Sequence, residues 1–273
     1  MPLNHKDIEA FRSIVWEFYH HNSRSMPWRD KHGFYDVLVS EMMLQQTQVP
    51  RVIPKFQQFM DSFPTIEQLA KSQIADVLQV WQGLGYNRRA KYLLEAAKRV
   101  VEEGIPSTHA ELESLPGIGR STASAIEVYV YDRPVVFVET NIRTVFFHHF
   151  FEKSLPLTKI TDTQVVDLVA RTLPSAHYRE WYWALMDYGT YLKSQGHGRI
   201  SNSAHYRAQT KFEGSVRQMR GYIIRRLTHG PLQLSDFATT DTRFAPALEG
   251  LLKDRMVEQR DDVIGLTGHQ QES

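Results

Sequence analysis

Two carboxylates and one glycine-rich turn carry the clearest chemistry in this sequence. The first carboxylate is Glu41. Its neighbours at helical spacing are Val37, Leu38, Leu44 and Gln45. Burial among apolar side chains favours the protonated form of a carboxyl group, which can then act as a general acid near neutral pH. The alternative is a glutamate on a partly exposed helix face.

The second carboxylate is Glu139, at the end of the apolar run Phe137–Val138 and just before a predicted helix. A negative charge at this position complements the helix dipole. From the sequence alone, this structural role is favoured over a catalytic one.

The glycine-rich turn is Leu115-Pro-Gly-Ile-Gly-Arg-Ser-Thr-Ala123. Gly117 and Gly119 permit a tight turn with exposed backbone N–H groups, and the N-terminus of the next helix points the same way. Such a turn can hold one backbone phosphate of a nucleic acid. A plain helix–helix turn is the alternative, and the full motif between two helices favours phosphate binding.

Mostly helical segments must position these residues. Hydrophobic periodicity and breaks at Gly, Pro and Asn predict helices over 7–20, 35–46, 49–60, 65–71, 74–82, 88–103, 111–115, from 120, and over 141–151, 163–172 and 178–193. The β-branched run 133–138 is predicted to be an extended link rather than a strand, since strand partners are missing around it.

A change of composition marks the C-terminal part. From 193 to 226 the basic residues face a single acid, Glu213. After a Gly-, Ser- and Asn-rich loop at 196–203, the order is helix, strand, helix and a strand pair within 257–266. That order predicts a small module like a winged helix over 213–273.

Composition excludes several classes of protein. The 273 residues are 42% hydrophobic, and 32 Lys and Arg nearly cancel 31 Asp and Glu. A nucleic-acid partner would therefore be held by local basic patches. There is no cysteine, which excludes disulfides, thiolate zinc sites and cysteine-ligated iron–sulfur clusters. The apolar runs are too short to span a membrane, and we expect a cytoplasmic protein.

Three motifs in series resemble the helix-hairpin-helix DNA glycosylase superfamily, and within it the MutY-type adenine DNA glycosylases. They are Ser40-Glu-Met-Met-Leu-Gln-Gln-Thr-Gln-Val49, Gly83-Leu-Gly-Tyr86 and the turn 115–123. The similarity covers about residues 10–192. It implies a mainly α, two-lobed helix-hairpin-helix glycosylase fold over 1–212, with a central lobe at about 30–133 and a second lobe formed by 1–29 and 134–212.

The resemblance also implies catalytic roles. Glu41 falls on the general acid that protonates N7 of a flipped adenine, and Glu139 falls on the carboxylate that stabilises the oxocarbenium-like sugar. Asn141 matches a polar active-site residue. Ser121 stands where relatives with lyase activity carry Lys, and because Ser cannot form a Schiff base, a monofunctional enzyme is implied.

Other positions match residues of the family that contact DNA. Gln46 and Tyr86 match residues that wedge into the duplex beside the orphaned base, with Thr47 and Leu84 at the edge. Gly117 and Gly119 would bind phosphate.

Further residues carry two interpretations each. Asp187 and Arg29 match positions near the base, but a salt bridge or a packing role fits Asp187 equally well, and Trp28 beside Arg29 could be core. Arg88, Arg89 and Lys91 could touch phosphates or form a solvated helix face. The pair His148-His149 suggests a metal, but adjacent helical residues point about 100° apart and no third ligand is evident, so no metal site is predicted.

The sequence departs from the family in three ways. Glu139 is one methylene longer than the usual Asp. The four cluster cysteines are absent from 188–206, so DNA docking must use other residues such as the basic stretch 199–226. The C-terminal Nudix-like domain that reads 8-oxoguanine is not expected in the tail. No cofactor is therefore predicted, apart from an optional structural cation at the hairpin.

The leading hypothesis is a monomeric DNA repair enzyme that acts on double-stranded DNA at the nucleoid. It would hydrolyse the N-glycosidic bond of adenine mispaired with guanine or 8-oxoguanine. One alternative is a glycosylase for another mismatched or damaged base, and another is a non-catalytic DNA-binding protein on the same scaffold.

Overall fold

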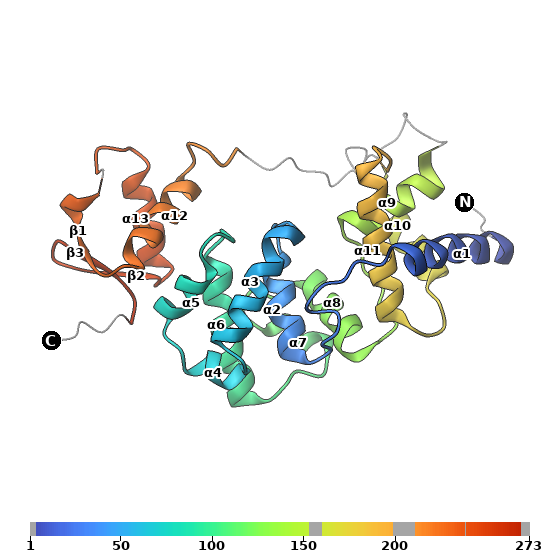
Figure 1. Cartoon of the computed structure of the whole chain (residues 1–273), viewed down its shortest axis with the longest axis horizontal. Coiled ribbons are helices and arrows are strands. Elements are labelled where there is room, and N and C mark those ends of the chain that lie inside the picture. The colour runs from blue at the N-terminus through green and yellow to red at the C-terminus, as the bar shows by residue number, and fades with distance from the viewer. Residues whose placement is uncertain (1–3, 153–159, 199–210, 238, 269–273) are drawn as a thin grey trace. The chain divides into compact units, whose positions relative to one another are not determined.

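The computed structural model describes residues 4–152, 160–198, 211–237 and 239–268, and it is mainly α-helical (Figure 1). It divides into two compact units, each assembled from two separate stretches of chain. Unit 1 comprises Met1–His32 and Gly119–Ala208, and unit 2 comprises Gly33–Ile118 and Gln209–Ser273.

Unit 1 is built around the long helix α11, which packs against α1 and α9. The helices of unit 1 are α1 (His5–Asn22), α8 (Arg120–Tyr131), α9 (Thr140–Phe146), the π-helical turn η1 (Phe147–Phe151), α10 (Asp162–Thr172) and α11 (Tyr178–Ser194). Aromatic side chains fill its core, where Phe11 of α1 meets Phe146 and Trp181. The extended link predicted at 133–138 is confirmed, since none of its residues lies in a helix or strand.

The first part of unit 2 is a cluster of six helices. They are α2 (Phe34–Leu44), α3 (Val49–Ser62), α4 (Ile66–Lys71), α5 (Ile74–Trp81), α6 (Arg88–Glu103) and α7 (His109–Ser114). Helix α5 packs against both α3 and α6, and Phe56, Phe59 and Trp81 are fully buried. The loop that follows α2 contains the end of the first motif, 40–49, and the loop that follows α5 contains the second motif, 83–86.

The C-terminal part of unit 2 has the predicted order of elements. Helix α12 (Val216–Leu227) precedes β1 (Leu232–Gln233), and α13 (Phe244–Lys253) precedes the hairpin of β2 (Val257–Arg260) and β3 (Val263–Leu266). The antiparallel sheet has the order β1-β3-β2, with Leu232 opposite Ile264 and Val257 opposite Leu266. Helices α12 and α13 pack on each other, as in a winged-helix module.

The unit boundaries differ from the predicted lobes. The expected borders at 29/30 and 133/134 fall instead at 32/33 and 118/119, because α8 packs with α11 in unit 1. The segment from 209 groups with unit 2 rather than standing alone. Within the described residues, no helix combines the length and apolar character needed to cross a membrane.

Candidate active site and nucleic-acid interface

Glu41 lies in the last turn of α2, at the edge of the buried face of that helix. Val37 and Leu38, one turn before it, are buried, whereas Glu41 itself is half-buried. Its own backbone carbonyl accepts a hydrogen bond from the N–H of Gln45, which ends the helix. Glu41 is therefore only partly shielded from solvent, and the full burial among apolar side chains considered from the sequence is not observed.

The loops after α2 and α5 expose Gln46 and Tyr86 in left-handed backbone conformations. Gln46 has φ 55° and Tyr86 has φ 50°, values that residues other than glycine seldom adopt. Gln46 is exposed and Tyr86 is half-exposed. Backbone strain of this kind persists only where the surroundings enforce it, and it is typical of functional loops.

Arg89 is the residue that holds both loops. Its guanidinium donates to the backbone carbonyls of Met42, Met43, Gln45, Leu84 and Gly85 and to the hydroxyl of Thr47. Burial lowers the pKa of Arg89 to about 10, so the side chain stays charged at neutral pH. Neither sequence interpretation of Arg89, a phosphate contact or a solvated helix face, anticipated this buried role.

Thr47 and Leu84 are also hydrogen-bonded by Arg89, and we call the set of contacts that Arg89 makes with the two loops the Arg89 clamp. Both are buried, and Arg89 binds the Thr47 hydroxyl at 3.0 Å and the Leu84 carbonyl at 3.3 Å. The structure therefore places them behind the exposed Gln46 and Tyr86, as residues that support the loops. Direct contact of their side chains with DNA stays a prediction.

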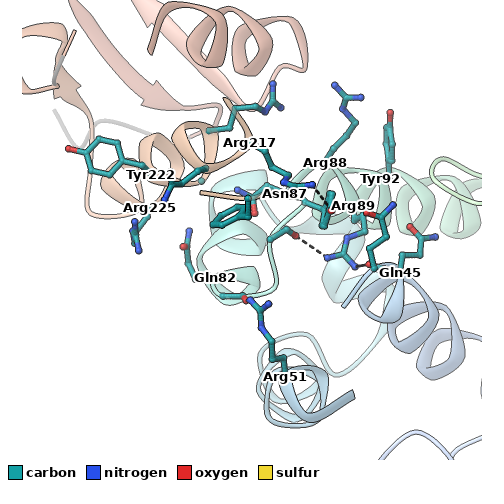
Figure 2. Close-up of a pocket in the computed structure, with 18 of the residues that line it drawn as sticks. Gln45, Arg51, Gln82, Asn87, Arg88, Arg89, Tyr92, Arg217, Tyr222 and Arg225 are labelled. Carbon is teal, nitrogen blue, oxygen red and sulfur yellow. Dashed lines mark hydrogen bonds between the residues drawn. The ribbon is translucent and has the colours of Figure 1, made fainter. Parts of the chain in front are cut away.

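A pocket of about 800 Å³ opens beside Tyr86 within unit 2 (Figure 2). Its lining joins Gln45, Gln46 and Tyr86 to arginines from three helices, and none of the described lining residues is acidic. These arginines are Arg51 of α3, Arg88 and Arg89 of α6, and Arg217, Arg220 and Arg225 of α12. Guanidinium groups interleaved with aromatic rings and amides suit a polyanion that also carries flat bases, which describes a nucleic-acid strand.

Tyr86 is enclosed by two of these arginines. The guanidinium carbon of Arg217 lies 5.1 Å from the centre of the Tyr86 ring and that of Arg89 lies 5.4 Å away. Nη1 of Arg217 also donates a 2.7 Å hydrogen bond to the Tyr86 hydroxyl. The basic stretch 199–226 singled out in the sequence thus contributes Arg217 to the pocket, while Arg199 and Arg207 lie outside the described residues.

Asp254, at the end of α13, links α12 to α6. Arg88 binds it through two nitrogens, at 2.9 Å and 3.1 Å, and Arg220 binds it as well. Burial alone would raise the pKa of Asp254, but the hydrogen bonds from Arg88 and Arg220 hold it below the usual value. This ion-pair network fixes α12 beside the loop of Tyr86.

The glycine-rich turn joins α7 to α8 as the sequence predicts. Gly117 has φ 77°, and a Cβ there would lie 2.8 Å from side-chain atoms of Met42 and Tyr92, so only glycine fits. Gly119 is the N-cap of α8 and has open space beside it, and Ser121 is exposed in the first turn. The open N-terminus of α8 can accept an anion.

Glu139 takes the N-cap position of α9, but its side chain does not cap the helix. One carboxyl oxygen, Oε1, is buried without a hydrogen-bond partner among the described residues. Burial raises the pKa of Glu139 to about 7, against the opposing charges of Lys193 and Arg143. Glu139 thus lies at the start of the helix as the sequence predicts, but the raised pKa weakens the charge–dipole role that the sequence favoured.

Asn141 follows in the first turn of α9, where α9 and α11 approach closely. A Cβ at Gly189 of α11 would lie 2.3 Å from the Asn141 carbonyl oxygen, so glycine at that position permits the approach. Asn141 is half-buried. The contact fixes the start of α9, and with it the backbone of Glu139.

Asp187 and Arg29 form a buried ion pair within unit 1. The two terminal nitrogens of Arg29, Nη1 and Nη2, bind the carboxylate at 2.7 Å and 2.8 Å, and Arg24 adds a third charged contact at 2.7 Å. Only 2% of Asp187 and 8% of Arg29 is exposed. This arrangement favours the salt-bridge interpretation of Asp187, and Trp28 is a core residue.

The two adjacent histidines have different surroundings. Nε2 of His149 lies 3.0 Å from the Tyr188 hydroxyl, whereas His148 faces Glu152 and His197. The two rings are nearly perpendicular, as their adjacency on a helix predicts. The sequence argument that no third ligand is evident therefore does not hold for His148.

Comparisons with known proteins identify the family of this chain. Residues 39–171 match the model described as "HhH-GPD superfamily base excision DNA repair protein". The adenine DNA glycosylase of Mycolicibacterium smegmatis is 33% identical, with 93% of this chain and 94% of that protein covered. The adenine DNA glycosylases of Buchnera aphidicola (subsp. Schizaphis graminum) and Homo sapiens are 32% and 33% identical.

Coverage differs among these relatives. The Buchnera and human alignments include 68% and 67% of this chain, but only 54% and 36% of those proteins. Among solved structures, a thermostable thymine-DNA glycosylase has a TM-score of 0.59 at 22% identity, covering 67% of this chain and 86% of that one. A trapped endonuclease III–DNA intermediate has a TM-score of 0.53 at 16% identity, covering 77% and 92%. These likenesses establish the two-lobed helix-hairpin-helix fold.

Proposed function

Because the chain belongs to the HhH-GPD superfamily of base excision DNA repair proteins, we propose that it is a monofunctional DNA glycosylase for adenine mispaired with guanine or 8-oxoguanine. The substrate would be double-stranded DNA from which the adenine has been flipped, since a base in the stack is out of reach of the enzyme. The reaction is hydrolysis of the N-glycosidic bond. Two carboxyl groups of the chain, those of Glu41 and Glu139, would take part in the reaction, and a water molecule would be the nucleophile.

Glu41 would supply the proton. Its place at the boundary between a buried helix face and the surface lets it meet an extruded base, and protonation of the adenine at N7 makes the base a better leaving group. Glu139 would face the positive charge that develops on the sugar. It is active in this role only when ionised, so we expect its raised pKa to appear in the pH profile of the reaction.

The observation that carries the proposal is the buried, unpartnered Oε1 of Glu139. A buried carboxyl oxygen without a hydrogen-bond partner is costly, and a purely structural glutamate would be expected to pair or to cap the helix. The free-energy cost of burying this oxygen has an explanation if the oxygen stabilises a cationic transition state. This supports a catalytic protein over a non-catalytic DNA-binding protein.

Most of the proposed DNA contacts lie in unit 2. Gln46 and Tyr86, held by Arg89, would enter the gap left by the flipped base, and the arginines of the pocket would neutralise neighbouring phosphates. The N-terminus of α8 would hold one more phosphate. Ser121 cannot form a Schiff base, so the strand would be left uncut at the abasic site.

The decisive experiment incubates the full chain with duplexes that carry each possible mispair, and A opposite 8-oxoguanine, and then treats them with alkali. We expect alkali-dependent strand breaks at A opposite G or 8-oxoguanine, with few breaks before alkali. Breaks at a different base would show that this base, and not adenine, is the substrate. Tight binding to all duplexes without any break would establish the non-catalytic alternative.

A further inference from the structure

Unit 1 contains a cluster of metal-ligand side chains that plays no part in the proposed reaction. His148 lies on η1, Glu152 follows one turn later, and His197 follows α11. Nδ1 of His148 lies 2.6 Å from Oε2 of Glu152, and Nδ1 of His197 lies 3.4 Å from Oε1 of the same carboxylate. One ligand atom from each residue lies within 4.8 Å of the other two.

The backbone holds His197 in this place. Gly198 has φ 60°, and a Cβ there would lie 2.4 Å from the carbonyl oxygen of Thr144 in α9. Only glycine permits that approach. The N–H of His197 also donates to the carbonyl of Leu192, at 2.9 Å. The close contact between the segment after α11 and α9 therefore holds His197 near His148.

The Glu152 carboxylate already brings the three side chains together, by an ion pair with His148 and a hydrogen bond with His197. Nδ1 of His148 is buried and lacks a hydrogen-bond partner of acceptable geometry among the described residues, although Glu152 is so close. A tetrahedral Zn²⁺ with bonds of about 2.1 Å holds its ligand atoms about 3.4 Å apart. Side-chain shifts of about 1 Å would bring the three atoms to that spacing, and the side chains of Glu152 and His197 are each 45% exposed.

We propose that His148, Glu152 and His197 bind a divalent transition-metal ion, for which Zn²⁺ is the best match. Two imidazoles and one carboxylate are ligands that zinc accepts, and a water would complete the coordination. The ion would tie the end of α11 to η1, which continues α9. His149 would not take part, because it contacts the Tyr188 hydroxyl and packs edge-on against Phe11.

The test uses the full chain, freed of metal with a chelator and titrated with Zn²⁺ by calorimetry near neutral pH. Co²⁺ is the second probe, because its visible absorption reports tetrahedral coordination. The variants are His197→Gln and Glu152→Gln, both at exposed side chains, and His148→Gln. The matched control is His109→Gln, which disrupts another histidine–glutamate pair four residues apart, His109 with Glu113, that belongs to no such cluster among the described residues.

We expect one equivalent of Zn²⁺ to bind, to raise the melting temperature and to displace Co²⁺ from a tetrahedral site. Each cluster variant should weaken binding at least about tenfold, whereas His109→Gln should bind as the parent does. A parent protein that takes up no equivalent of either metal would overturn the proposal, leaving only an ion-paired triad. So would cluster variants that bind as tightly as the parent, because the metal would then sit elsewhere. Circular dichroism verifies that each variant is folded, and base excision is not needed as a readout.

Discussion

Nη1 of Arg217 donates a 2.7 Å hydrogen bond to the hydroxyl of Tyr86, with the guanidinium also lying over the tyrosine ring. Arg217 and Tyr86 are separated by 131 residues of sequence. The contact therefore joins the C-terminal module to the loop that we propose enters the duplex. We therefore expect the C-terminal module to contribute to DNA binding through this contact.

Arg217→Ala is expected to weaken binding of mispaired duplex and to reduce the salt dependence of affinity by about one counterion. The reason is the loss of one cation from the pocket and of the support for Tyr86. Fluorescence anisotropy at several salt concentrations measures both effects. Arg260→Ala is the matched control, since Arg260 is a largely exposed arginine of the same module. Equal effects of the two substitutions would mean that only net charge matters.

Glu41→Gln is expected to abolish base release and to leave DNA affinity largely intact. The amide keeps the shape of the side chain but has no acidic proton to donate to the adenine. Single-turnover excision with alkali treatment measures release, and anisotropy measures binding. Release at the parental rate would remove Glu41 from the role of general acid.

The unfolding free energy should depend on pH through Glu139. Its pKa is raised from 4.5 to about 7 in the folded state, so the folded protein binds a proton more tightly than the unfolded chain does. The stability contributed by this proton is fully present below about pH 4.5 and is lost as the pH rises to about 7, with a slope of at most about 1.4 kcal/mol per pH unit. Urea unfolding at several pH values measures it.

Glu139→Gln should flatten this pH dependence, because the amide does not titrate. Glu102→Gln, at an exposed helical position, should leave it unchanged. A parental slope that survives in Glu139→Gln would show that other groups are responsible.

Arg89→Met should destabilise unit 2 by about 3 kcal/mol or more, because five carbonyls and one hydroxyl lose a buried donor. Arg88→Met at the adjacent, half-exposed position should cost about 1 kcal/mol or less. Urea denaturation compares the two. Similar losses of unfolding free energy in the two variants would contradict the role of Arg89 in holding the loops. A stable Arg89→Met protein should still show slower excision, because the loops after α2 and α5 are no longer held.

Asp187→Asn should lower the free energy of unfolding by about 3–5 kcal/mol, because it leaves the buried Arg29 without its counter-charge. Asp167→Asn is the control, since the ion pair of Asp167 with Arg171 is exposed. If the folded Asp187→Asn protein is as stable as the parent and loses only excision, Asp187 contacts the base instead.

Local patterns were sufficient for the elements of this protein. Periodic apolar residues and breaks at Gly and Pro predicted nearly every helix within two residues, including α6 over 88–103, because amphipathic spacing is a property of neighbouring residues. The same holds for the order of helices and strands in the C-terminal module. The glycine requirement at Gly117 was also visible, since a tight turn is local.

Contacts between distant residues were not visible in the sequence. The burial of Arg89 and its six acceptors, the pairing of Arg217 with Tyr86 and the approach of His197 to His148 each depend on how helices pack. The surroundings of Glu139 were hidden for the same reason: the sequence placed it correctly at the start of α9, but only tertiary packing shows that one oxygen of its carboxyl group is buried. The sequence by itself determined the helices, the turns and the residue types available for chemistry, whereas only the tertiary structure decided which charges are buried and which are paired, because desolvation and ion pairing depend on neighbours brought together by folding.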